Sequence, residues 1–354
     1  FLEYQRRQDV LQSLYVYLLT VREQTAVAGY NNFGPIQIID RPQAAVYPWW
    51  PNKIIVPLAA IFLGLLIPAC SIFIKELLNN KIISPGDVVA NTTAPVVAEI
   101  SHTRSKNSIV VTKESRSPVA EQFRTLRTNL LFRMAKSNEK VILCSSGSSN
   151  EGKTFVSINL ATAFALAGKK VLLIDFDLRK MQLTETLGLQ DKTGIGDYLE
   201  NHASFTGVVQ PSGIDPNLWV VTAGISATNP SEILLSEKIL QFFQEARNKF
   251  DFIILDTAPV AVVTDAQVIA PFADITLYVV RQKHTFKKHI EVIEDLRQNN
   301  KMRNINVILN DVQLVSGYNH GFGYGFRFDE GYDYYQEDET EKRSILQMIF
   351  KPVD

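Results

Sequence analysis

Residues 54–74 form a run of 21 residues without a charged side chain, and this run constrains the chain more than any other feature. As a helix rising 1.5 Å per residue it would be about 31 Å long, which matches the hydrocarbon core of a bilayer. Lys53 and Lys75 flank the run, and Trp49 and Trp50 precede it, where aromatic side chains favour the membrane interface. A buried helix of a soluble domain is the alternative; the 53 preceding residues exclude a signal peptide. The run therefore predicts a transmembrane helix in a lipid bilayer.

The segments on either side of this run differ in pattern. Residues 1–28 lack Gly and Pro and carry apolar residues at helical spacing, which predicts a long amphipathic helix ended by Gly29. A short strand over 36–39 and a proline-rich stretch should follow it. Residues 76–116 are mixed in composition and are expected to be loop-like, with a turn at 84–86.

A regular alternation of apolar strands and helices begins at Ser117-Pro118, a pair suited to an N-cap and the first turn of a helix. The predicted strands are 140–145, 170–175, 218–222, 251–256, 275–280 and 305–309. The predicted helices between them include 153–167, 231–248 and 285–299. Strands that alternate with helices favour an α/β fold with a doubly wound, mostly parallel sheet.

Composition excludes two classes of protein. The 36 basic and 37 acidic residues nearly balance, which argues against a protein built to coat nucleic acid, so no nucleic-acid partner is expected. Two cysteines, Cys70 and Cys144, are too few for a disulfide scaffold.

The first predicted strand is followed by a glycine-rich loop of the form G-x4-G-K-T. Its residues are Gly147, Ser148, Ser149, Asn150, Glu151, Gly152, Lys153 and Thr154. In a strand–loop–helix context the backbone N–H groups of such a loop surround phosphates, and the helix N-terminus adds partial positive charge. Lys153 should reach the β and γ phosphates of ATP and Thr154 should bind Mg²⁺. The alternative, a chance match in a Ser/Gly loop, lacks that context.

Three aspartates stand at the ends of two other apolar strands. Asp175 and Asp177 end one strand in the pattern D-x-D-x-R, and Asp256 ends another in D-x-x-P. Ligands bind at the carboxyl ends of strands in open α/β sheets. Three carboxylates beside a phosphate loop would repel one another without a cation, so Mg²⁺ is predicted there. Any one of them alone could instead be a helix N-cap.

The order of these motifs, with the preceding membrane helix, resembles the bacterial protein-tyrosine kinases, the P-loop kinases of the polysaccharide co-polymerase type. The resemblance implies that Lys153, Asp175, Asp177 and Asp256 are catalytic residues. Asp175 would accept the proton of a tyrosine hydroxyl, Asp177 would bind Mg²⁺ with Thr154, and Asp256 would bind the metal through water or orient it. By analogy Asn310 contacts adenine, or else caps a turn.

Related ATPases of the chromosome-partitioning and cell-division type share this fold but carry a lysine at the second position of the loop. That position is Ser148 here, which favours the kinase.

Glu121, Arg124 and Arg127 form an E-x2-R-x2-R pattern before the phosphate loop. By itself the pattern is typical of a solvated helix face with i,i+3 ion pairs. The resemblance implies instead a contact between neighbouring subunits of a homo-oligomeric ring, an octamer in that family.

The C-terminal segment concentrates tyrosines: five of the chain's 12 fall within 18 residues. They are Tyr318, Tyr324, Tyr332, Tyr334 and Tyr335. Glycines and acidic residues surround them, which predicts a flexible tail that serves as the phosphoacceptor of neighbouring subunits, or else an aromatic linker. Each phosphate would add roughly −1.5 to −2 charges, so progressive phosphorylation should loosen the ring. The basic run 283–289 is expected to be a solvated helix face, or a docking site for this tail.

The domain organisation follows from these assignments. Its parts are the end of a periplasmic chain-length-determinant module (1–53), the transmembrane helix (54–74), a cytoplasmic linker (75–116), the kinase domain (117–315) and the tail (316–354). Flanking charges do not decide the orientation, but ATP places the phosphate loop, and so 75–354, in the cytoplasm; the membrane is then the bacterial inner membrane. By resemblance, more of the periplasmic module and a first membrane helix precede Phe1.

Three functions are consistent with the sequence. The first is a tyrosine autokinase that controls capsular or exopolysaccharide export, with an outer-membrane export protein, a polymerase and a tyrosine phosphatase as partners implied by the resemblance. The second is a membrane-tethered ATPase that positions cargo. The third is a non-catalytic co-polymerase assembly module.

Overall fold

The computed structural model describes residues 2–32, 54–105, 107–134, 139–189, 193–224 and 230–313. The chain divides into two compact units, Phe1–Leu78 and Asn79–Asp354.

Where the structure describes it, the first unit contains two helices, α1 (Leu2–Asn32) and α2 (Ile55–Leu77). Helix α1 continues past Gly29, so the prediction that this glycine ends the helix is wrong; one glycine inside a helix costs only about 1 kcal/mol relative to alanine. The strand predicted over 36–39 and the proline-rich stretch lie outside the described residues.

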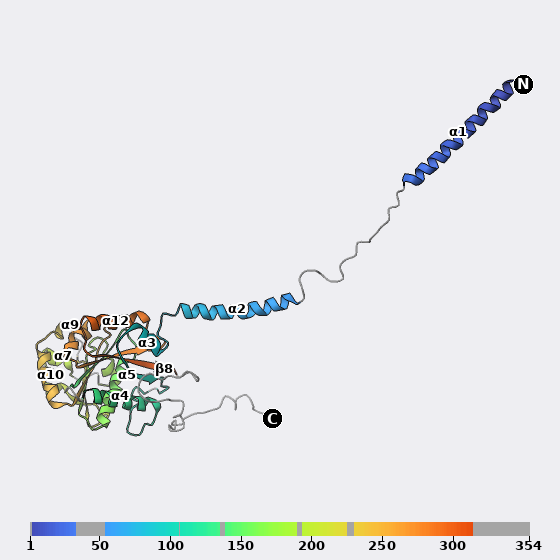
Figure 1. Cartoon of the computed structure of the whole chain (residues 1–354). Helices are drawn as coiled ribbons and strands as arrows, with labels where there is room; N and C mark the ends of the chain where they lie inside the picture. The colour runs from blue at the N-terminus through green and yellow to red at the C-terminus, as the bar shows by residue number, and fades with distance from the viewer. Residues whose placement is uncertain are drawn as a thin grey trace, which may run out of the picture. The chain divides into compact units, whose positions relative to one another are not determined.

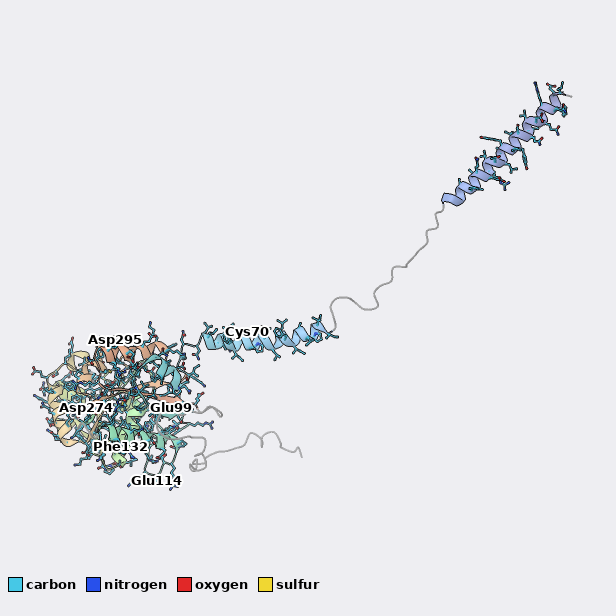
Figure 2. All side chains as sticks on the ribbon, in the orientation of Figure 1. Cys70, Glu99, Glu114, Phe132, Asp274 and Asp295 are labelled. Atoms are coloured by element: carbon cyan, nitrogen blue, oxygen red, sulfur yellow. The ribbon has the colours of Figure 1, made fainter. Side chains whose placement is uncertain are left out.

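Helix α2 carries the uncharged run. Among the described residues it is the one helix long and apolar enough to cross a membrane, and none of its apolar window is buried against the rest of the protein. Figure 2 shows its side chains, with Cys70 among them, standing out around the helix axis. Lipid is the medium in which an apolar surface exposed on all sides is stable.

The second unit is built on one eight-stranded sheet with the order β1-β8-β7-β2-β6-β3-β5-β4. Every neighbouring pair is parallel except β4 and β5. The strands are β1 (Val96–Ser101), β2 (Val141–Ser146), β3 (Val171–Asp175), β4 (Gln210–Pro211), β5 (Leu218–Val221), β6 (Phe252–Asp256), β7 (Ile275–Arg281) and β8 (Ile305–Val312). The predicted doubly wound, mostly parallel sheet is thereby confirmed.

Helices cover both faces of this sheet. In Figure 1, α4 (Pro118–Met134) and α5 (Lys153–Leu166) lie on one side of it, and α3 (Pro85–Asn91) and α12 (Lys287–Gln298) lie on the other. The other helices are α6 (Gln182–Thr186), α7 (Ile195–Leu199), α8 (Phe205–Val208), α9 (Pro230–Ile233), α10 (Lys238–Lys249), α11 (Asp265–Ile269) and the 3₁₀ turn η1 (Ala270–Phe272).

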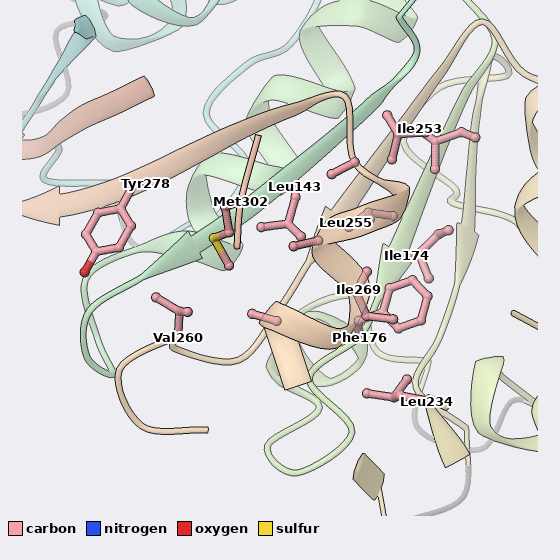
Figure 3. Close-up of a cluster of buried hydrophobic side chains, with 14 of the residues drawn as sticks. Leu143, Ile174, Phe176, Leu234, Ile253, Leu255, Val260, Ile269, Tyr278 and Met302 are labelled. Carbon is pink, nitrogen blue, oxygen red and sulfur yellow. The ribbon is translucent and has the colours of Figure 1, made fainter. Parts of the chain in front are cut away.

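The pleat of the strands divides the core into two layers. Val141 and Leu143 of β2 pack into the layer beneath α10 and α12, while Ile142 and Cys144 pack into the layer beneath α4 and α5. Figure 3 shows side chains from neighbouring strands and from the loops after them meeting in the first layer. Burying one such aliphatic side chain stabilises the fold by about 1.5–3 kcal/mol.

The six predicted strands and the helix that begins after Ser117 are confirmed. Ser117 Oγ accepts a hydrogen bond from Ala120 N at 3.2 Å, as an N-cap does.

Two predictions about elements are wrong, and one strand was not predicted. The segment 76–116 is not loop-like, because it contains α3, whose N-cap is Ser84, and the edge strand β1. The two-residue strand β4 has no sequence pattern of its own and depends on pairing with β5. The single helix expected over 231–248 is two helices, α9 and α10, separated by a turn that buries Leu234 in the core.

Candidate nucleotide and phosphoryl-transfer site

The glycine-rich loop joins β2 to α5 at the carboxyl edge of the sheet. Its two glycines are required by close packing. Gly152 has a φ of +96°, and a Cβ there would lie 2.0 Å from Asn310 Nδ2; a Cβ at Gly147 would lie 2.7 Å from the hydroxyl of Tyr278. The loop backbone is therefore held against β7 and β8, and only glycine fits at these two positions.

A buried carboxylate organises the inside of the loop. Glu151 accepts hydrogen bonds from Ser148 N at 2.8 Å, from Ser148 Oγ at 3.1 Å and from Thr285 Oγ1 at 2.6 Å. Asn310 Nδ2 donates to the Glu151 carbonyl at 3.0 Å, and Arg281 donates to the Asn150 carbonyl at 2.9 Å. Asn310 thus contacts the loop backbone, and its predicted contact with adenine stays a prediction.

Lys153 and Thr154, at the start of α5, line a cavity of about 310 Å³ together with Asn150, Gly152 and Arg281. Lys153 is largely buried, and burial lowers its pKa, whereas the charges of Asp256, Asp177 and Glu151 oppose that shift. A buried ammonium that faces carboxylates at the mouth of a helix is suited to binding a polyphosphate.

Asp256, at the end of β6, is joined directly to the loop helix. Its carboxylate accepts from Thr154 Oγ1 at 2.6 Å and from Ser157 Oγ at 3.1 Å. Burial raises the pKa of Asp256 to about 6, against the lowering effects of Thr154, Lys153 and Ser157. Ser157 was missed at the sequence level; its position one turn after Lys153 on the same helix was the available signal.

Asp175 is paired with Asp256 across β3 and β6 and is fully buried. One of its oxygens accepts from Thr184 N at 3.0 Å and Thr184 Oγ1 at 2.6 Å, and the other accepts from Asp177 N at 3.1 Å. Burial, and next the charge of Asp256, raise the pKa of Asp175 to about 7. No sequence signal pointed to Thr184, because its contact with Asp175 depends on how α6 folds back.

Asp177 follows β3 by two residues and holds the turn after it. Its Oδ1 accepts from Lys180 N at 3.0 Å, and its charge acts on both Lys153 and Asp256. The structure therefore brings all three predicted aspartates to the phosphate loop.

The donor set of this site is made of oxygen atoms, as Mg²⁺ prefers. Within the described residues no group of three or more His, Cys, Asp or Glu side chains is gathered as a complete metal cage. An ion bound here would complete its coordination with phosphate oxygens and water. Thr154, Asp177 and Asp256 are the residues that would hold it.

The E-x2-R-x2-R residues on α4 make contacts within the chain. Arg124 pairs with Glu121 at 2.8 Å and also donates to the Ser115 carbonyl at 2.6 Å. Arg127 donates to the Ala163 carbonyl at 3.2 Å, and its Nε is buried without a hydrogen-bond partner. The subunit-interface role of these residues stays a prediction.

The remaining predicted segments are placed as follows. Of the basic run 283–289, Lys287 pairs with Asp87 of α3 at 2.8 Å, and Lys283 donates to Gln313 at 2.6 Å. The five tyrosines of the tail lie outside the described residues.

Comparison with known protein families agrees with this geometry. A profile described as the CobQ/CobB/MinD/ParA nucleotide binding domain matches residues 142–319, which include the phosphate loop and the three aspartates. A second profile, described as a "G-rich domain on putative tyrosine kinase", matches residues 1–77. The fold and the loop thus define a nucleotide-binding protein of the P-loop class.

Individual relatives narrow this class. Tyrosine-protein kinase ptk of Acinetobacter johnsonii is 28% identical over 328 residues, which cover 89% of this chain and 45% of that protein. "Putative tyrosine-protein kinase CapB" of Staphylococcus aureus is 30% identical over 217 residues, which cover 61% of this chain and 95% of that protein. The solved kinase domain of Escherichia coli tyrosine kinase ETK matches with a TM-score of 0.60 and 27% identity, covering 69% of this chain and all of that domain.

The chain belongs to the family of bacterial tyrosine-protein kinases, as its motifs indicated. It spans about half the length of the longer relatives such as ptk, of which it covers 45%.

Proposed function

We propose that this chain is a membrane-anchored tyrosine autokinase that transfers the γ-phosphoryl group of ATP to tyrosines in the C-terminal tail of neighbouring copies. In this reaction the tyrosine oxygen attacks the γ phosphorus and the bond from that phosphorus to the leaving ADP oxygen breaks. The phenolic proton passes to Asp175. The acceptors would be the predicted tail residues Tyr318, Tyr324, Tyr332, Tyr334 and Tyr335.

The observation that carries this proposal is the joining of three separate motifs at one edge of the sheet. Thr154 of the phosphate loop donates to Asp256 at 2.6 Å, and Asp256 is paired with Asp175 on the adjacent strand. A phosphate-binding loop, a metal-binding carboxylate and a candidate base therefore lie side by side, which is the arrangement that in-line phosphoryl transfer needs.

Each of these residues has a distinct task. Lys153 would bind the β and γ phosphates, and the backbone N–H groups of the loop would bind the phosphate oxygens that Lys153 does not contact. Mg²⁺, held by Thr154, Asp177 and Asp256, would neutralise charge on the phosphates. The pKa of Asp175 is raised to about 7, which suits a group that accepts a proton near neutral pH, and Thr184 holds its carboxylate in place.

The proposal extends to location and assembly. Residues 1–53 would lie in the periplasm and 75–354 in the cytoplasm, with α2 crossing the inner membrane. The family supports self-association, and we propose a ring in which Glu121, Arg124 and Arg127 contact the adjacent subunit. Its role would be to control polymerisation and export of a capsular or extracellular polysaccharide, with the outer-membrane exporter, polymerase and phosphatase as partners.

The test is to incubate the purified full chain with Mg²⁺ and ATP and to map phosphotyrosine by mass spectrometry. The expected result is phosphate on the tail tyrosines and none in an Asp175→Asn variant. ATP hydrolysis without tail phosphorylation would instead indicate the cargo-positioning ATPase, and no turnover of either kind would indicate a non-catalytic assembly module.

The ring has its own test. Mass photometry should give a large assembly for a variant with all five tail tyrosines changed to Phe, and smaller species for the fully phosphorylated protein. The same oligomeric state for both would refute a phosphorylation-controlled ring.

A further inference from the structure

Lys180 lies over the phosphate loop, although it belongs to the turn that follows β3. Its Nζ donates to the hydroxyl of Ser149, in the middle of the loop, at 3.1 Å. Besides burial, which lowers the pKa of Lys153 most, the nearby charge of Lys180 lowers it as well. Two ammonium groups from separate segments therefore face the same small region of the loop.

The turn that carries Lys180 is fixed at several points. Asp177 Oδ1 accepts from Lys180 N at 3.0 Å, and the Asp177 carbonyl accepts from Met181 N at 2.8 Å. Met181 has a φ of +49°, which reverses the chain, and three residues later Thr184 is bound to Asp175. The backbone at Lys180 is thus anchored on both sides, and its side chain is directed from a rigid base.

The basic residue before Lys180 in the sequence forms an ion pair with another element. Arg179, the arginine of the D-x-D-x-R pattern, pairs with Asp265 of α11 at 2.9 Å. Of these two neighbouring basic residues, it is Lys180 that makes a contact with the loop.

The phosphate loop itself carries little positive charge, which is the reason for a second cation beside it. Lys153 is the one basic residue between Gly147 and Thr154, where Glu151 adds a negative charge. The second loop position, where related ATPases carry a lysine, is Ser148, and both its backbone N–H and its hydroxyl are engaged by Glu151. A triphosphate that enters this loop would meet less positive charge than the ATPase loops offer.

We propose that Lys180 is a catalytic residue that binds the γ phosphate of ATP, supplying from the D-x-D-x-R turn the cation that the loop itself lacks at Ser148. The hydroxyl of Ser149 holds the ammonium over the loop until the phosphate arrives. This inference rests on the proposed function for its substrate. It does not depend on which hydroxyl, tyrosine or water, attacks the phosphorus.

The test compares Lys180→Met and Lys180→Arg in the full chain. Lys169→Met is the matched control, because Lys169 is an exposed lysine just before the N-terminal end of β3, whereas Lys180 follows its C-terminal end. ATP turnover is measured from the release of ADP, and tail phosphorylation is measured by anti-phosphotyrosine blotting. The affinity for ADP is measured by calorimetry. Loss of one charged contact to the transferred group typically costs about 10²–10³ in kcat.

For Lys180→Met we expect a fall of about 10²-fold in kcat, with ADP affinity within about threefold of wild type. Lys180→Arg should recover a measurable part of the loss, and Lys169→Met should match wild type. A kcat for Lys180→Met within twofold of wild type would overturn the inference. So would a loss of ADP affinity as large as the loss of kcat, since that would indicate a collapsed loop.

The two proposals fail separately. If wild type releases ADP but leaves the tail unphosphorylated, the kinase proposal fails while the effect of Lys180→Met on ADP release still decides the role of Lys180. If wild type phosphorylates its tail and Lys180→Met does so equally well, only the assignment of Lys180 fails.

Discussion

Replacing Thr154 by Val separates the metal-binding role of this residue from its role in the fold. Valine has nearly the same shape as threonine but lacks the hydroxyl that donates to Asp256 at 2.6 Å. Ser157 donates to the same carboxylate at 3.1 Å but is not an expected metal ligand, so Ser157→Ala is the matched comparison. Both changes leave a fully buried carboxylate with one side-chain donor fewer.

The size of the effect can be derived from the surroundings of Asp256. A buried acceptor that loses a partner costs about 1–3 kcal/mol. The pKa of Asp256 is already raised to about 6, so the carboxyl can take up a proton at pH 7 at a cost of about 1.4 kcal/mol, which limits the loss. We therefore expect each variant to lose about 1–2 kcal/mol of stability, or about 2–8 °C in Tm.

The assay is the Tm of each variant without nucleotide and with Mg²⁺ and ADP at 100 times the wild-type Kd. That concentration should stabilise a binding-competent protein by about 2.7 kcal/mol. Wild type and Ser157→Ala should show this increase, and Thr154→Val should not. The reasoning is refuted if Thr154→Val keeps the nucleotide-dependent increase, or if Ser157→Ala loses it.

Two further predictions concern the same site. Because the pKa of Asp256 is raised above its ordinary value to about 6, the folded protein binds more protons than the unfolded chain between about pH 4 and 6. The metal-free protein should gain stability from this group as the pH falls through that window. Over the same window the affinity for Mg²⁺–ADP should fall, because protons compete for the carboxylate. Calorimetry from pH 8 to 5.5 measures that affinity, and an unchanged value contradicts the prediction. Gly152→Ala should abolish nucleotide binding and lower stability by about 1–3 kcal/mol, because the φ of Gly152 is +96° and the new Cβ would lie 2.0 Å from Asn310. A thermal-shift assay with and without nucleotide measures both effects. Gly168→Ala is the control for backbone strain alone, because Gly168 also has a positive φ but has open space around it.

Much of this architecture could be predicted because it depends on local signals. The uncharged run predicted α2, and the alternation of apolar strands with helices predicted a parallel sheet with the phosphate loop at its carboxyl edge. The two missed strands share a feature: β1 and β4 are the edge strands of the sheet, and each pairs with a single neighbour, β8 and β5. The hydrophobic periodicity and the composition of a segment carry no information about partner strands that are distant in the sequence.

For the site, the residue types could be read from the sequence: a phosphate loop, three aspartates after apolar strands, and a serine in place of a lysine. Their contacts, in contrast, depend on how the elements pack. The register of β3 on β6 sets Asp175 beside Asp256, the packing of α5 brings Thr154 and Ser157 onto one carboxylate, and the turn after β3 carries Lys180 to Ser149. The physical reason is that a motif is a property of neighbouring residues, whereas hydrogen-bond geometry, burial and the resulting pKa values are properties of segments that lie far apart in the chain and meet only when the sheet forms.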